Sequence, residues 1–166
     1  MKKVIILFCT LVLTISVQAK EAPSKATFLP PIGFQVMAAE GIRIKYPNGN
    51  APQYVVTSES TETTIAVDTR YRNLPQSELK AWSNELESSI KKVAQIRSNK
   101  IVQLAGQKWV QIEFISDAIG SKIYNILLTT GLKGKQMVVF NFNSSLKEFK
   151  RYEPDLRKSI QSITLK

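Results

Sequence analysis

Hydrophobic and polar residues alternate with a period of two through most of this chain. Short β-branched runs predict strands at 34–37, 42–46, 53–58 and 64–72, and longer runs predict strands at 97–104, 108–116, 121–130 and 135–143. Only a few turn residues separate the last four strands. Because parallel strands need a long crossover, we expect these four to be antiparallel neighbours.

The hairpin formed by strands 121–130 and 135–143 is apolar on both faces. In the first strand, Tyr124, Ile126 and Leu128 point one way, and Ile123 and Leu127 point the other. A strand that is apolar on both faces needs cover on both faces. We therefore expect this hairpin at the centre of the sheet, between helices.

The period changes to that of a helix in two places. The first is 73–95, where one arc of about 100° collects Leu79, Trp82, Leu86, Ile90 and Val93. A capping box of Asn73 with Gln76 would start this helix, and Trp82 is expected to anchor the core.

The second helical segment starts at Ser145, which can form a capping box with Glu148. Pro154 falls on its outward side, and residues 163–165 are expected to close as a short strand. The inward side collects Phe149, Tyr152, Leu156, Ile160 and Ile163.

The N-terminus has the pattern of a secretory signal peptide: Lys2 and Lys3, an apolar run at 4–17, and small residues before a cut after Ala19. The run is shorter than a bilayer span. We expect export to the periplasm, with secretion as the alternative. Residues 20–31 then read as a flexible leader and 32–166 as a single domain.

Export would change the composition. Loss of Lys2 and Lys3 from the 23 basic residues leaves 21 against 13 acidic ones, a net charge of +8, and the only cysteine leaves as well. The chain has no histidine. Thiolate and imidazole chemistry and zinc ligation by these residues are therefore excluded. No nucleotide-binding or calcium-loop motif occurs, so we expect no cofactor, no metal and no catalytic residues.

Residues 98–166 resemble the C-terminal half of DcrB-like proteins of the bacterial envelope, whose fold is shared by the photosystem extrinsic protein PsbP and a Ran-binding nuclear import factor. The resemblance rests on an L-x-G-x-K turn at Leu104–Lys108, the strand meander after it, and a closing helix with Ser159-Ile160 before a short strand. "GIRIKYP" at Gly41–Pro47 looks like the family's early strand. The chain lacks the lipid-modified cysteine of DcrB.

This resemblance implies an α+β fold: a three-layer α/β/α sandwich around a mainly antiparallel sheet, PsbP-like. It implies no catalytic residues, and proteins of this fold mostly act as binding or assembly partners.

Basic residues on the last helix form a candidate interaction surface for an acidic protein partner or an anionic membrane surface. Acidic neighbours dilute its charge, and a plain solvated helix face is the alternative. Nucleic-acid binding is not expected, because the charge is spread along the chain. The surface consists of Lys147, Lys150, Arg151, Arg157 and Lys158.

Two groups of polar residues lie within the strands. Asp68, Arg70 and Arg72 share one strand face, where the first two can form an ion pair. Four more polar residues interrupt the apolar meander: Gln111, Glu113, Asn125 and Asn141. If they converged, they would line a polar cleft in which the pKa of Glu113 is raised. Wet strand margins are the simpler explanation.

These observations favour an exported, non-enzymatic protein that binds another envelope protein or assists envelope assembly. One alternative is an immunity protein that neutralises a toxin delivered to the periplasm. A second is an envelope enzyme that uses Glu113 or another carboxylate as acid and base.

Overall fold

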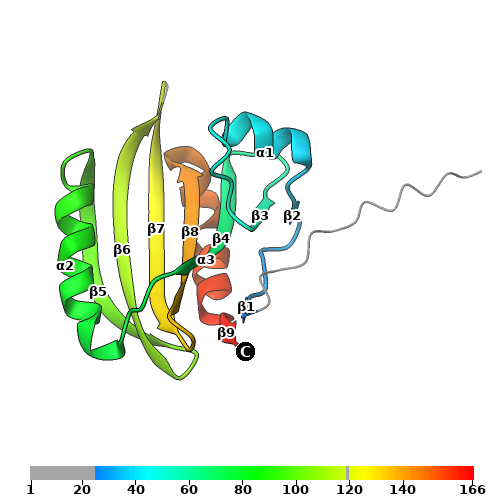
Figure 1. The fold of residues 1–166 in the computed structure, drawn as a ribbon. Coiled ribbons are helices and arrows are strands. Elements are labelled where there is room, and N and C mark those ends of the chain that lie inside the picture. The colour runs from blue at the N-terminus through cyan, green and yellow to red at the C-terminus, as the bar shows by residue number, and fades with distance from the viewer. Residues whose placement is uncertain (1–24, 119) are drawn as a thin grey trace, which may run out of the picture.

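The computed structural model describes residues 25–118 and 120–166, so the expected signal peptide lies outside the described residues. Its elements follow one another as the sequence pattern predicts, with exceptions given below (Figure 1). In chain order they are β1 (Ala26–Thr27), β2 (Gln35–Val36), α1 (Ala39–Lys45), β3 (Tyr54–Thr57), β4 (Thr63–Tyr71), a 3₁₀ turn (Gln76–Glu78), α2 (Leu79–Ile90), β5 (Ala94–Leu104), β6 (Gln107–Ala118), β7 (Ser121–Leu132), β8 (Gln136–Ser145), α3 (Leu146–Gln161) and β9 (Thr164–Leu165).

Seven strands form one sheet in the order β2-β3-β4-β8-β7-β6-β5, and every neighbouring pair is antiparallel. The β7–β8 hairpin has a strand on each side of it within the sheet, which confirms its expected central position. The meander from β5 to β8 follows chain order because each link is short. β8 then pairs with β4, which joins the early strands to the meander.

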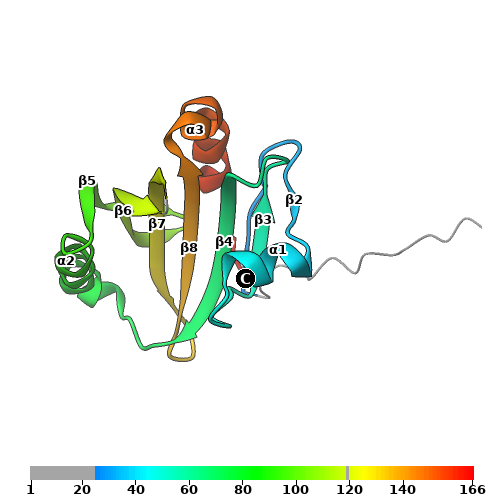
Figure 2. The same ribbon diagram turned by 90° about the horizontal axis from the view of Figure 1, so that it is seen from above.

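Helices cover the two faces unequally (Figure 2). The helix α3 lies on one face, whereas α2 and α1 lie towards opposite ends of the other. The expected α+β fold with layers on both faces of an antiparallel sheet is confirmed. We call the two sides of the sheet the α3 face and the α2 face.

The larger core lies on the α3 face. Trp109 is fully buried there and its indole N–H donates to the Leu104 carbonyl at 2.9 Å, so the buried polar atom is satisfied. Phe140 packs edge-to-face against Trp109 at 6.0 Å between ring centroids. The core on the α2 face is smaller and is centred on Leu74, Leu79, Val110, Ile112 and Met137.

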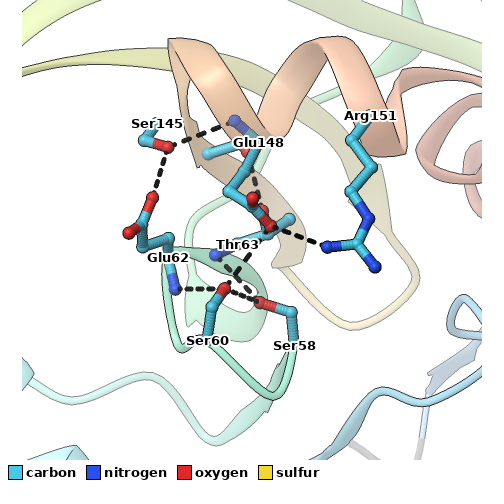
Figure 3. A network of polar contacts seen from close by, with 8 residues as sticks. Ser58, Ser60, Glu62, Thr63, Ser145, Glu148 and Arg151 are labelled. Carbon is cyan, nitrogen blue, oxygen red and sulfur yellow. Dashed lines mark hydrogen bonds and ion pairs between the residues drawn. The ribbon is translucent and has the colours of Figure 1, made fainter.

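The start of α3 is tied to the β3–β4 turn (Figure 3). Ser145 caps the helix, and its Oγ accepts from the Glu148 backbone N–H at 3.3 Å and donates to Glu62 at 2.7 Å. The Glu148 carboxylate does not reach back to the Ser145 N–H. It accepts instead from the Ser60 hydroxyl at 3.4 Å, so only half of the expected capping box forms.

Residues 25–31, expected as part of a flexible leader, belong to the folded body. β1 pairs antiparallel with β9, which confirms the expected closing strand. Ala26 is fully buried, and the Phe28 ring packs edge-to-face on Phe140 at 5.6 Å. The segment 20–31 holds three prolines and few apolar residues, a composition typical of a flexible leader, yet Ala26 and Phe28 pack against the core.

Residues 42–46, expected as a strand, lie instead in and just after the helix α1. The strand position beside β3 is taken by β2, so this segment has no strand to pair with. Its backbone bonds are satisfied locally, as when the Tyr46 N–H donates to the Ile42 carbonyl at 2.9 Å. The "GIRIKYP" segment is therefore helical, contrary to the expected early strand.

The first long helix begins later and ends earlier than its pattern predicted. The expected capping box with Asn73 is wrong, because Gln76 reaches the sheet instead. Its side chain donates to Thr130 Oγ1 and accepts from the Lys108 backbone N–H, both at 3.0 Å. Since α2 ends at Ile90, Val93 lies beyond it and is 79% exposed.

Candidate functional site

The four polar residues of the meander do not converge, because strand alternation places them on opposite faces. Gln111 and Glu113 alternate with Val110 and Ile112 along β6 and face α3. Asn125 and Asn141 lie on the α2 face, since Asn141 pairs with Leu127, which in turn pairs with Ile112. The condition for a single polar cleft, that these residues converge, is therefore not met.

Glu113 forms a closed cluster on the α3 face. Its two carboxylate oxygens accept from the Arg157 guanidinium at 2.6 and 2.8 Å, and they also accept from Tyr124 Oη at 2.6 Å and Gln111 Nε2 at 2.7 Å. Arg157 additionally donates to Glu153 at 3.1 Å. The two carboxylate oxygens of Glu113 thus accept four hydrogen bonds, which stabilise the ionised form.

The electrostatics of this cluster oppose acid–base use of Glu113. Burial by itself raises the pKa of Glu113, but the bonds from Arg157 and Tyr124 outweigh it and lower the pKa to about 2. Burial and the adjacent carboxylate raise the pKa of Tyr124 to about 12. The raised pKa that a polar cleft would have given Glu113 is therefore not found, and the carboxylate is poorly suited to proton transfer near neutral pH.

The same cluster removes Arg157 from the expected basic surface. Its side chain is only 35% exposed and its guanidinium is directed at Glu113. The sequence grouped it with the other cations of the last helix because the sequence does not show that Glu113 lies on the sheet below.

The other four cations of that surface are exposed on α3. Arg151 lies 4.0 Å from Glu148 and its guanidinium stands over the Tyr152 ring at 5.0 Å. Lys158 pairs with Asp155 at 3.0 Å, and among the described residues Lys147 and Lys150 have no ion-pair partner. Exposed pairs of this kind contribute little, so the surface is a dilute one.

The α2 face carries a hollow of about 390 Å³. Its lining residues come from β4, β8 and β7, from α2 on one side and from the loop between α1 and β3 on the other. It exists because α2 packs on β5 and β6, whereas α1 stands over the far end of the sheet, where Lys45 donates to Thr64 at 3.0 Å. We call it the α2-face hollow.

The floor of the α2-face hollow consists of two rows of paired residues. Ala66, Asn141 and Leu127 face one another across β4, β8 and β7, and Asp68, Val139 and Thr129 form the next row. Its walls are Trp82 and Leu86 of α2 and, on the loop, Tyr46, Asn50 and Pro52. Leu127, expected to be dry, is half-buried because no helix lies directly over it.

Polar atoms without partners gather around this hollow. In the part of the chain that the structure describes, four buried side-chain polar atoms have no hydrogen-bond partner, and three belong to residues lining the hollow. They are Trp82 Nε1, Thr129 Oγ1 and Asn141 Oδ1. An unmet buried polar group costs about 1–3 kcal/mol, so the packing around the hollow carries a local energetic cost.

Charged side chains at its margin satisfy one another. Arg70 donates to Asp68 at 3.0 Å, which confirms the expected same-face pair. Arg72 stacks over the Trp82 ring, with 3.8 Å from its guanidinium carbon to the ring centroid, and donates to Glu85 at 3.3 Å. These contacts hold the Trp82 indole at the wall of the hollow, whereas the sequence predicted that Trp82 would anchor the core.

Sequence reasoning missed the α2-face hollow because no motif marks it. Asn141, a polar residue within the apolar strand β8, was the one visible signal. Within the described ranges, 25–118 and 120–166, no group of His, Cys, Asp or Glu could hold a metal ion. In the same ranges, no helix combines the length and apolar character needed to cross a membrane.

Comparisons with known proteins agree on the fold. No family model and no curated protein matches the sequence. Cyanobacterial PsbP (CyanoP) from Synechocystis sp. PCC 6803 matches with a TM-score of 0.53 at 9% identity, over 85% of this chain and 86% of that chain. LpqN, involved in cell envelope biogenesis of Mycobacterium tuberculosis, matches with a TM-score of 0.58 at 11% identity, over 84% and 82%. The chain therefore has a PsbP-like fold.

Proposed function

We propose that this protein is an exported, non-enzymatic binding module of the bacterial envelope that recognises another envelope protein through the α2-face hollow. The observation that carries the proposal is the hollow itself, an opening of about 390 Å³ over the central strands, lined by apolar and polar side chains. The central strands of a sheet are normally covered, and a site left open there is available to a partner.

Other observations support this role. The signal-peptide pattern at the N-terminus favours the periplasm. The carboxylate cluster around Glu113 is closed and fully paired, which favours a structural role over catalysis. LpqN, a protein of the same fold, is involved in cell envelope biogenesis, and this fits an envelope role here.

Site-specific photo-crosslinking in living cells tests the proposal. A benzoylphenylalanine residue replaces Asn50, which is exposed at the margin of the hollow, and in a matched variant it replaces Lys150, which is exposed on α3. We expect a discrete crosslinked envelope protein from position 50 and none from position 150. Crosslinking only from position 150 would transfer the binding role to the basic helix, and saturable products from neither would refute the proposal.

A further inference from the structure

The loop between β1 and β2 exposes two large aliphatic side chains beside α3. Leu29 is 73% exposed, and Ile32, at 102%, is the most exposed large apolar residue of the described chain. We infer that residues 29–33, the 29–33 loop, and the outer side of α3 together dock the protein on an anionic lipid bilayer. Leu29 and Ile32 enter the edge of the hydrocarbon layer, and the cations of α3 meet the headgroup phosphates.

The 29–33 loop is held on both of its sides. The Leu29 N–H donates to Ser162 Oγ at 2.8 Å. The Phe34 N–H donates to the Pro31 carbonyl at 3.1 Å and closes a turn in which Gly33 has a φ of 83°, a conformation that favours glycine. Because the turn is closed and Pro31 is buried beneath it, Ile32 stays in water unless another phase or molecule covers it.

The 29–33 loop lies along the helix that carries the exposed cations. Figure 2 shows the segment before β2, in blue, on the same side of the sheet as α3. The Phe34 ring packs edge-to-face on Tyr152 at 5.3 Å between ring centroids, and the Arg151 guanidinium stands over the same ring. Lys147, Arg151 and Lys158, spaced four and seven residues apart, form one row on the outer side of α3. The apolar tip and the cations therefore share one surface.

The charge of α3 is positive but moderate, and this makes the apolar tip necessary. The helix carries five basic residues against three acidic ones, a net charge of +2. Asp155 offsets Lys158 at 3.0 Å, and the Glu148 side chain is only 11% exposed. Stable attachment to a membrane surface takes two signals, and exposed aliphatic side chains beside cations provide both.

A bilayer matches the shape of this surface. Ile32 stands at the tip of a turn, so a protein partner would need a pocket built around it, whereas a hydrocarbon layer needs no matching shape. Cations on the outer side of a helix attract headgroup phosphates without a fixed geometry. The α2-face hollow lies on the other face of the sheet, so docking through the α3 face leaves the hollow open to its proposed partner.

Vesicle binding by the mature chain, residues 20–166, tests the inference, because this chain contains all described residues but not the apolar run at 4–17. The probes are vesicles of phosphatidylcholine and phosphatidylglycerol in equal parts, and co-sedimentation gives the partition coefficient. Ile32→Ser should lower the partition coefficient about tenfold, as the loss of one large aliphatic contact does. Ile44→Ser removes an aliphatic side chain that is 73% exposed on α1, and it should leave binding unchanged.

A charge variant tests the role of α3. The double variant Lys147→Gln/Arg151→Gln should lower binding to the anionic vesicles about tenfold and should not change the weak binding to phosphatidylcholine alone. Lys80→Gln/Lys92→Gln removes the same charge on and just after α2, at the opposite face of the sheet, and should bind as the unaltered chain does. Thermal unfolding curves identify any variant that is misfolded.

A fluorescent label reports which part of the protein enters the bilayer. The mature chain has no cysteine, so bimane can be attached to a single cysteine in Ile32→Cys or, as the control, in Asn50→Cys. On vesicle binding, we expect the emission from position 32 to shift to shorter wavelength and to be quenched by spin-labelled lipid. The emission from position 50 should not change.

Several outcomes overturn the inference. They are an absence of preference for the anionic vesicles, equal losses for Ile32→Ser and Ile44→Ser or for the two charge variants, and an unchanged emission from position 32. If benzoylphenylalanine at position 32 crosslinks a discrete envelope protein in cells and the vesicles do not bind, the surface belongs to a protein partner instead. The crosslinking at position 50 is scored separately, so failure of the proposed function leaves this inference standing.

Discussion

Replacing Arg157 by methionine should leave the negative charge of Glu113 buried without an ion-pair partner. Methionine keeps an unbranched apolar stem but supplies no donor to Glu113, whose side chain is 6% exposed. The remaining partners, Tyr124 and Gln111, are neutral. Removing one member of a buried ion pair is costly because the other charge stays in a poorly solvated place.

The magnitude follows from the pKa of Glu113. The difference between its ordinary value of 4.5 and about 2, at about 1.4 kcal/mol per pH unit, corresponds to about 3 kcal/mol. Part of the Arg157 guanidinium faces solvent, so we reduce the expected loss to about 2 kcal/mol at pH 7. Because the pKa is lowered by folding, this stabilisation is fully present above about pH 5 and is lost as the pH falls towards 2.

Urea unfolding at pH 7 and pH 3, followed by tryptophan fluorescence, measures the effect. We expect Arg157→Met to lower the free energy of unfolding by about 2 kcal/mol at pH 7, with less than half of that loss at pH 3. The double variant Glu113→Gln/Arg157→Met carries no buried charge and serves as the control. It should be more stable than Arg157→Met at pH 7, and the part of its stability that depends on the titration of Glu113 should be gone.

The reasoning would be refuted by a loss of stability that is equal at the two pH values, or by a double variant no more stable than Arg157→Met at pH 7. Either result would mean that packing of the arginine stem, rather than the charge of Glu113, determines the effect.

Three further variants test the fold. Gly131→Ala should destabilise by about 2 kcal/mol or more in urea unfolding, because its Cβ would lie 1.8 Å from the Leu74 carbonyl oxygen; an unchanged midpoint would contradict this close approach. Ser145→Ala should cost about 1 kcal/mol by the same assay, since α3 loses its cap, whereas Ser145→Thr, which keeps the hydroxyl, should retain most of the stability. Trp109→Phe should cost about 2 kcal/mol, because a fully buried indole loses volume and its bond to Leu104; a loss below 0.5 kcal/mol by thermal melting would contradict this.

Local patterns were enough to predict most of the sheet. Strand alternation and short links are properties of neighbouring residues, so the antiparallel order of β5 to β8 could be predicted, whereas the pairing of β4 with β8 could not. The segment at 42–46 failed because Ile42 and Ile44 satisfy a strand pattern, while the place beside β3 was already occupied by β2. A local preference for a strand is overridden when no partner strand is available to pair with the segment.

The candidate site depended on contacts between distant segments. The sequence grouped Arg157 with the other cations of the last helix, and only the position of Glu113 on β6 explains why its side chain turns in. Trp82 was rightly placed on the apolar side of its helix. Whether that side would be fully covered depended on where α2 sits over the sheet, which no local pattern records.

The amino-acid sequence alone determined the antiparallel meander, the two long helices and the narrow range of chemistry left without histidine. The tertiary structure alone decided that Gln111 and Glu113 part from Asn125 and Asn141, that residues 25–31 dock, and that α2 and α1 leave the α2-face hollow between them. The physical reason is the distance along the chain over which each effect acts. Periodicity and turn chemistry act within a few residues, whereas burial, ion pairing and the opening of a hollow depend on which distant surfaces meet.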